Sequence, residues 1–167
     1  MKILLTGGAG YIGIHTAVEL CRCGYDVVIA DNYFNSTPEA VKRAEKLTER
    51  TIPVYETDVS TSKRQSLYQV STITNIKFKV YQIDMLNRVE LEKVFLENQL
   101  DAVIHFAGYK AVGDSVKYPV SYYRNNINTT LAVLDIMEEF GVRFLIFSSS
   151  ATVYGVPKKT PISETDG

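Results

Sequence analysis

The sequence predicts an α/β fold in which a doubly wound, parallel sheet is covered by helices on both faces. Short apolar runs alternate with segments of helical character along the 167 residues, and this alternation is typical of parallel sheets. The first apolar run, residues 2–6, leads into a glycine-rich turn, a helical segment and a second apolar run, residues 27–30. This is the order of a strand–helix–strand unit, and right-handed connections give the expected strand order 3-2-1-4-5.

Composition and charge exclude several classes of protein. Apolar residues make up 46% of the chain, within the globular range, and the length fits one domain. The 18 basic and 19 acidic residues form no basic stripe, so we expect no nucleic-acid partner. No apolar run approaches the roughly 18 residues of a membrane span, and no signal-peptide pattern is present. We therefore expect a cytoplasmic protein with no membrane partner, in which Cys21 and Cys23 are reduced thiols.

The glycine-rich turn and the acid that follows the second run predict a dinucleotide site. Gly7, Gly10 and Gly13 have a spacing that lets a backbone turn sharply and approach a pyrophosphate. A helix that begins there would offer its N–H groups and the positive end of its dipole. Asp31, 18 residues beyond Gly13, stands where a carboxylate can hydrogen-bond an adenosine ribose. The glycine spacing alone is a weak signal. The strand before it, the helix after it and the acid at the end of the next strand distinguish it from a turn that binds nothing.

Two segments compete for the third strand of the sheet. Residues 54–58 and 80–84 share the pattern Val-Tyr-x-x-Asp. Only the second is followed by a clear amphipathic helix, for which Asn87 supplies a cap. We therefore assign Asp84 as the functional strand end and residues 54–79 as an insertion. A surface hairpin is one explanation for the insertion, and a gene-model error such as a translated intron is another.

The remaining elements place their polar ends on the same rim of the sheet. Ser36 and Glu39 have capping-box spacing before a polar helix. Strands are expected over residues 101–106 and 142–147, with a long helix over residues 119–140 between them. We expect that helix to face the core with one stripe of apolar residues, namely Val120, Ile127, Leu131, Leu134 and Met137.

Three motifs resemble those of a known family. Residues 6–13, Thr-Gly-Gly-Ala-Gly-Tyr-Ile-Gly, resemble the opening of the extended short-chain dehydrogenase/reductase superfamily, whose fold is Rossmann-like. Residues 105–115 and 147–155 resemble, more narrowly, the UDP-glucose 4-epimerase family. The resemblance covers nearly the whole chain apart from residues 54–79. It implies the NAD-binding portion of such an enzyme, given as a fragment that stops before the later strands and the C-terminal substrate domain.

The resemblance implies NAD as the cofactor and gives roles to residues along the rim. Asp31 favours NAD over NADP, because a carboxylate repels a 2′-phosphate. The cofactor-binding set is Gly7, Gly10, Tyr11, Ile12, Gly13, Asp31, Asn32, Asn35, Ser36, Asp84, Phe106, Ala107, Gly108, Lys110 and Asn125. A UDP-sugar substrate would be met by Lys110, Ser150 and Thr152, with Ser150 as the catalytic residue at the reacting hydroxyl. No metal site is expected.

The implied activity is the interconversion of UDP-glucose and UDP-galactose through a 4-keto sugar, an isomerase reaction of galactose metabolism. The family uses as its base a tyrosine from a helical Tyr-x-x-x-Lys pair. Tyr154 and Lys158 fit that pattern by letters, but Gly155 and Pro157 disfavour a helix there. We therefore expect the catalytic pair to be missing and the chain to be inactive alone.

Other expectations from the resemblance are less direct. Thr129 stands where the family has glycine, which puts close packing of that helix in doubt. The resemblance suggests a homodimer of the full-length form through the helix at residues 119–140. Two alternative functions remain open: a catalytically inactive NAD-binding module in regulation or interaction, and a related sugar-nucleotide dehydratase or dehydrogenase.

Overall fold

A parallel sheet forms the centre of the protein, as the sequence predicts. The structure is a computed structural model, and it describes all residues except 49, 56–67, 74–76, 157–158 and 166–167. The strands of the main sheet are β1 (Lys2–Thr6), β2 (Asp26–Asp31), β5 (Lys79–Gln82), β6 (Ala102–His105) and β7 (Phe144–Phe147). They pair in parallel in the order β5-β2-β1-β6-β7, which confirms the predicted order 3-2-1-4-5.

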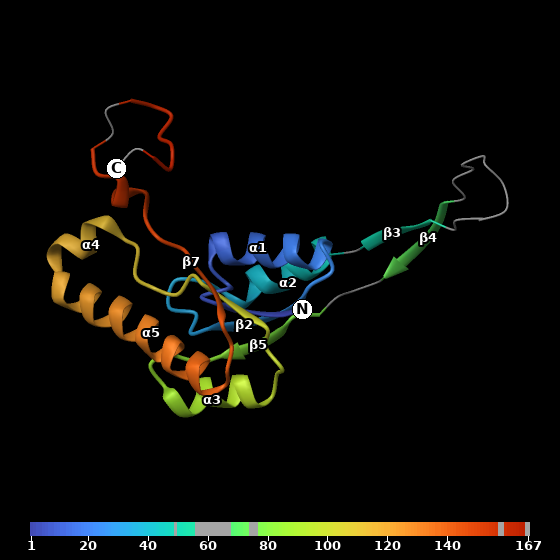
Figure 1. Cartoon of the computed structure of the whole chain (residues 1–167), viewed down its shortest axis with the longest axis horizontal. Coiled ribbons are helices and arrows are strands. Elements are labelled where there is room, and N and C mark those ends of the chain that lie inside the picture. The colour runs from blue at the N-terminus through green and yellow to red at the C-terminus, as the bar shows by residue number, and fades with distance from the viewer. Residues whose placement is uncertain (49, 56–67, 74–76, 157–158, 166–167) are drawn as a thin grey trace.

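Helices cover the two faces of this sheet (Figure 1). On one face, α1 (Tyr11–Arg22) and α2 (Pro38–Leu47) share an apolar cluster with alternate strand residues such as Ile3 and Leu5. On the other face, α3 (Arg88–Leu96) and α5 (Pro119–Glu139) pack against the intervening residues, such as Leu4. Successive side chains of a strand point to opposite faces, so a strand that is apolar throughout supplies both cores.

A hairpin outside the main sheet decides which candidate is the third strand. β3 (Arg50–Tyr55) pairs antiparallel with β4 (Tyr68–Ile73), and these two strands form a sheet of their own that extends away from the domain (Figure 1). The strand that joins β2 is β5, which is followed by Asp84 and α3, as predicted. The hairpin lies near the expected insertion of about 54–79, and β5 begins at Lys79. That these residues are an insertion stays a prediction.

Of the two helix caps predicted from the sequence, the structure has the one at α3 and lacks the one at α2. Asn87 caps α3, because its side-chain oxygen accepts from the N–H of Glu90 at 3.4 Å, as expected. The capping box expected at Ser36 is wrong, since α2 begins after Thr37 and Ser36 donates its hydroxyl to Asp31 instead. A short helix, α4 (Val112–Lys117), was not predicted, and η1 (Ala151–Tyr154) is a 3₁₀ turn.

The apolar stripe predicted to bury α5 is mostly on its exposed side. Met137 is buried, but the side chains of Val120, Ile127, Leu131 and Leu134 are 65, 51, 52 and 40% exposed. The helix instead rests on the sheet through Thr129, Val133, Ile136 and Met137. The prediction failed because apolar residues occur on two sides of α5, and periodicity alone cannot tell which side meets the sheet.

A buried histidine ties the central strands to α5. His105, the last residue of β6, is 2% exposed, and its Nδ1 lies 2.6 Å from the hydroxyl of Thr6 in β1. Its Nε2 lies 3.2 Å from the hydroxyl of Thr130, which itself donates to the carbonyl of Asn126. Thr130 must then accept from Nε2–H, so the ring is the neutral Nε2–H tautomer. Burial, and then the positive charge of Lys110, lower the pKa of His105 to about 4.

No helix in the described part of the chain is both long and apolar enough to span a bilayer. Cys21 is buried on α1, and Cys23 is exposed at the end of that helix.

Because the hairpin strands pair outside the main sheet, we expect the domain to fold without them. Replacing residues 49–76 with a short Gly-Ser linker should shift the melting temperature by only a few degrees, because β3 and β4 pair with each other alone. The linker has a short distance to span, since the N–H of Phe78 donates to Glu45 of α2. Deleting residues 54–79 instead removes the buried Phe78 and should destabilise the protein by about 3–5 kcal/mol. Thermal unfolding of both variants tests this, and equal losses would contradict it.

The neutral state of His105 predicts a pH-dependent stability. The folded pKa lies below the ordinary 6.5, so the unfolded chain binds the extra proton first as the pH falls. The free energy of unfolding should therefore be fully present above pH 6.5 and fall by roughly 3 kcal/mol as the pH drops to about 4.

Urea titrations across this range should show the fall in the free energy of unfolding in the wild type and in a His15→Gln control, because the side chain of His15 is exposed. The His105→Gln protein should not show this fall. The same pH slope in all three proteins would refute the role given to His105.

Candidate functional site

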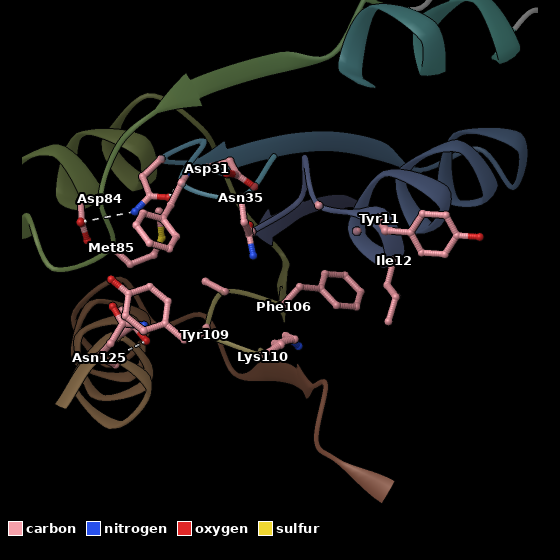
Figure 2. Close-up of a pocket in the computed structure, with 18 of the residues that line it drawn as sticks. Tyr11, Ile12, Asp31, Asn35, Asp84, Met85, Phe106, Tyr109, Lys110 and Asn125 are labelled. Atoms are coloured by element: carbon pink, nitrogen blue, oxygen red, sulfur yellow. Dashed lines mark hydrogen bonds between the residues drawn. The ribbon is translucent and has the colours of Figure 1, made fainter. Parts of the chain in front are cut away.

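A single cleft collects the carboxyl ends of the central strands (Figure 2). It has a volume of about 350 Å³, in the range of small-molecule sites. Its lining consists of Gly7, Gly10, Tyr11, Ile12, Gly13, Asp31, Asn32, Phe34, Asn35, Ile83, Asp84, Met85, Phe106, Ala107, Gly108, Tyr109, Lys110, Asn125 and Thr129. The cleft lies where the chain leaves β1 for one face of the sheet and β6 lies on the other side, the position where open α/β sheets bind ligands.

The glycine turn brings the start of α1 to the floor of the cleft. Gly7 has a φ of +66°, and a Cβ there would lie 2.7 Å from the backbone nitrogen of Ala107. A Cβ on Gly13 would lie 2.7 Å from the carbonyl oxygen of Gly7. Only glycine fits either place, so the turn, the helix and the loop after β6 are packed backbone to backbone.

The first turn of α1 is open to a ligand. Its N-cap residue is Gly10, which has no side chain to accept the N–H groups of that turn. Gly10, Tyr11, Ile12 and Gly13 all line the cleft. Unpartnered N–H groups and the positive end of the helix dipole favour an anion, and phosphate is the usual one.

Asp31 holds the adjacent wall together. Its side chain is buried, with 6% of the residue exposed, at the end of β2. One carboxylate oxygen accepts from the N–H of Ala9 at 3.0 Å, and the other accepts from the N–H of Tyr33 and the hydroxyl of Ser36, both at 2.8 Å. Ser36 itself does not line the cleft, so it reaches the site through Asp31. Burial, and then the charge of Asp31, raise the pKa of Tyr33, whose phenol stays protonated.

Asp84 closes the far end of the same wall. One of its oxygens accepts from the N–H of Leu86 at 2.9 Å, and the other lies 3.5 Å from the amide nitrogen of Asn32 (Figure 2). The loops after β2 and β5 are thus linked side chain to side chain. This is the position expected for the adenine end of a dinucleotide.

The opposite end of the cleft is built by the loop after β6 and by α5. Phe106, Ala107, Gly108 and Lys110 come from the loop, and Asn125 comes from α5. The loop is held by Asn126, whose side chain accepts from the N–H of Tyr109 at 2.7 Å and donates to the carbonyl of the same residue at 3.0 Å. Every residue expected to bind the cofactor lines this cleft except Ser36.

Thr129 does not disturb α5. The residue is 4% exposed, and its hydroxyl donates to the carbonyls of Asn125 and Asn126 on its own helix. The side chain therefore satisfies its polar atom within the helix while it lines the cleft.

Two of the three residues expected to meet the sugar do not line the cleft. Ser150 and Thr152 do not line it, and their hydroxyls are 2.8 Å from each other on the exposed turn after β7. The structure therefore brings Lys110 to the cleft and leaves the other two expected substrate residues beside each other elsewhere.

The letters Tyr-x-x-x-Lys do not start an α-helix here. The 3₁₀ turn η1 ends at Tyr154, and Gly155 follows with a φ of +67°. This agrees with the expectation that Gly155 breaks the helical register after Tyr154. Lys158 lies outside the described residues.

Five lining residues were not anticipated: Phe34, Ile83, Met85, Tyr109 and Thr129. Ile83 and Met85 flank Asp84, and Tyr109 precedes Lys110, so their places beside expected residues were an available signal. Phe34 precedes Asn35 and had the same signal. Thr129 carried none, because its position depends on which side of α5 faces the sheet.

The residues present fit a dinucleotide. A phosphate-sized anion could bind at the uncapped first turn of α1. The turn before it needs glycine, because a Cβ on Gly7 or Gly13 would collide with backbone atoms. A ribose could bind at the carboxylate of Asp31. The two halves of the cleft extend to either side of the glycine turn. The order of donors and acceptors thus matches the charge pattern of a molecule with a central pyrophosphate.

Comparisons with known proteins agree with this geometry. Residues 3–167 match the model of the NAD dependent epimerase/dehydratase family. The chain is 44% identical over 164 residues to UDP-glucose 4-epimerase of Bacillus subtilis, covering 98% of this chain and 41% of that protein. It is 46% identical over 157 residues to UDP-glucose 4-epimerase uge1 of Schizosaccharomyces pombe, covering 94% of this chain and 37% of that protein.

A solved structure shows the same likeness. UDP-glucose 4-epimerase of Bifidobacterium longum, in complex with NAD⁺ and UDP, superimposes with a TM-score of 0.79 at 43% identity and covers 100% of this chain and 42% of that one. The chain spans about two fifths of the length of these relatives. With a family match over nearly its whole length, a Rossmann-like sheet and a cleft shaped for a dinucleotide, the chain belongs to the NAD dependent epimerase/dehydratase family.

Proposed function

We propose that this chain is the NAD-binding part of a UDP-glucose 4-epimerase, which interconverts UDP-glucose and UDP-galactose through a 4-keto sugar. One observation carries the proposal. A single continuous cleft runs from Asp84 and Asp31, past the bare first turn of α1, to Lys110 and Asn125. Its polar groups occur in the order that NAD requires, and the family match supports the same cofactor.

The residues of the cleft would divide the work of binding. The backbone of Gly10 to Gly13 would hold the pyrophosphate, Asp31 the adenosine ribose, and Asp84 with Asn32 the adenine side. Lys110 and Asn125 would bound the nicotinamide end. Bound NAD would supply a reversible hydride acceptor. Lys110 is exposed at the lip and would lie near the positive nicotinamide ring, which does not neutralise its charge. It therefore suits a residue that also meets an anionic UDP-sugar.

Ser150 and Thr152 would complete the sugar side. Their hydroxyls already share a hydrogen bond on an exposed turn, where each retains capacity for a second partner. Ser150 would then hydrogen-bond the hydroxyl that is oxidised. The relative from Bifidobacterium longum was solved with UDP, which supports a uridine nucleotide as the substrate class.

We further propose that the 167-residue chain is inactive alone and that its full-length form is a dimer. The 3₁₀ turn η1 ends at Tyr154, and Gly155 follows at a φ of +67°, which does not suit the helical Tyr-x-x-x-Lys geometry. The apolar residues exposed along α5 support an interface in the full-length protein. A non-catalytic NAD-binding module would share the cleft, and it differs from the first proposal in that no longer form would show epimerase activity.

Substitution of Asp31 tests the cofactor assignment. Asp31→Ala should both weaken NAD binding and lower stability, because the carboxylate accepts three hydrogen bonds within the protein. Asp31→Asn keeps the shape and removes the charge, but its NH2 group must face the N–H of either Ala9 or Tyr33. It should therefore lose part of the stability and also relax the preference for NAD over NADP, by about tenfold or more. Calorimetric titration with both cofactors, alongside the thermal midpoint, separates the two effects. An Asp31→Asn protein with unchanged selectivity would mean that Asp31 does not face the ribose.

The missing base predicts a lack of turnover. The 167-residue chain, saturated with NAD, should not convert UDP-galactose to UDP-glucose, because the turn at Tyr154 and Gly155 does not begin the helix on which a tyrosine–lysine pair would take the proton. A coupled assay for UDP-glucose detects the product, with the Bacillus subtilis relative as the positive control. Measurable turnover that is lost in Tyr154→Phe would show that Tyr154 serves as the base after all.

A further inference from the structure

Three aromatic rings form a row along the lip of the cleft. The ring of Phe34 lies 5.0 Å from that of Tyr109, tilted by 33°. The ring of Tyr109 in turn meets the edge of Tyr122 at 5.4 Å and 63°. Phe34 and Tyr109 both line the cleft, and Phe34 is 70% exposed. None of the roles derived above uses this row.

The row joins two loops that hold opposite halves of the site. Phe34 comes from the loop after β2, which carries Asp31 and Asn35. Tyr109 comes from the loop after β6, next to Lys110, and Tyr122 is on α5. β1 lies between β2 and β6 in the sheet, so the contact between Phe34 and Tyr109 spans the end of β1, where the glycine turn begins. Figure 2 shows Tyr109 on the side of Asn125, across the cleft from Asp31.

The backbone at Tyr33 and Phe34 determines the position of the Phe34 ring. Tyr33 has a φ of +56°, a conformation that is costly for a residue with a side chain. It is held by the hydrogen bond from its N–H to Asp31, and the next N–H, that of Phe34, donates to the side-chain oxygen of Asn32 at 3.0 Å. These two successive turns direct Phe34 over the cleft rather than away from it.

The second ring is fixed as firmly. The backbone of Tyr109 makes two hydrogen bonds with the side chain of Asn126, and its ring packs on Tyr122 of the same helix. Both rings are therefore carried by backbone that is held by hydrogen bonds within the site. A large aromatic ring that stays 70% exposed gains little from the core, and its partner is the ring across the cleft.

We propose that Phe34 and Tyr109 act as an aromatic clasp that closes over the middle of the bound cofactor and slows its release. This inference rests on the proposed function, since it takes NAD as the occupant of the cleft. The clasp spans the position of the pyrophosphate, where the cofactor would otherwise be open to water on the side away from α1. A dinucleotide enters or leaves only when the two rings separate, so the ring contact adds to the barrier for both steps. Phe34 and Tyr109 are positioning residues and take no part in hydride transfer.

Dissociation kinetics test the clasp on the full 167-residue chain. The chain has no tryptophan, so NADH fluorescence can be followed with little background while excess NAD displaces it. Phe34→Ala and Tyr109→Ala should each raise the dissociation rate constant roughly three- to tenfold, the usual strength of an aromatic pair. The double variant should be no faster than either single variant, because each removes the same contact.

Matched variants separate the clasp from general damage. Tyr109→Phe keeps the ring and should release NADH at the wild-type rate, while Phe34→Leu, which keeps an apolar side chain without a ring, should be faster. Tyr123→Ala removes a similarly exposed ring of α5 that is outside the row, and it should have no effect. The thermal midpoint of the cofactor-free Phe34→Ala protein should stay within about 2 °C of the wild type, because the ring is mostly exposed.

Each other outcome overturns the proposal. Unchanged release from Phe34→Ala and Phe34→Leu would show that the rings do not retain the cofactor, and it would leave the proposed NAD site intact. Slower release or tighter binding would show that the rings obstruct the cleft. Additive effects in the double variant would show that the two rings act separately. A wild-type chain that binds neither NAD nor NADH would overturn both the clasp and the proposed function.

Discussion

The carboxylate of Asp31 is the point on which the site depends. It is buried at the end of β2 and accepts from Ala9 of the glycine turn, from the backbone of Tyr33 and from the hydroxyl of Ser36. Because these donors come from two separate loops, one side chain sets the distance between the start of α1 and the wall of the cleft. A buried carboxylate needs such donors, since leaving it unpartnered would cost several kcal/mol. The residue that would select a ribose is thus also the residue that builds its surroundings.

A second anchor fixes the other half of the site. Asn126 pairs with the backbone of Tyr109, and Thr130, one helical turn further along α5, joins the same helix to His105 of β6. His105 reaches on to Thr6, the residue immediately before the glycine turn. These contacts lock α5, β6 and β1 into one unit. The two halves of the cleft meet at the glycine turn and, at the lip, through the rings of Phe34 and Tyr109.

Sequence reasoning succeeded where the cause is local. The glycine spacing, the acid after β2 and the cap at Asn87 act within a few residues, and the strand order follows from short right-handed connections. It failed where the local sequence was compatible with two different arrangements. α5 has apolar residues on two sides, and the sheet selected the side with Thr129 and Val133 rather than the side with Ile127 and Leu131. Ser36 had the spacing of a cap, yet α2 begins after Thr37, and the hydroxyl of Ser36 donates to the carboxylate of Asp31.

By itself, the sequence determined the class of fold, the rim on which the polar residues gather and the kind of ligand, because periodicity and turn chemistry are properties of neighbouring residues. It also singled out Asp84 over Asp58, through the helix that follows. Only the tertiary structure decided that Phe34 meets Tyr109, that His105 is held neutral between Thr6 and Thr130, and that Ser150 lies apart from the cleft. Each of these joins segments far apart in the chain, and its energy depends on distances that exist only once the sheet has brought those segments together.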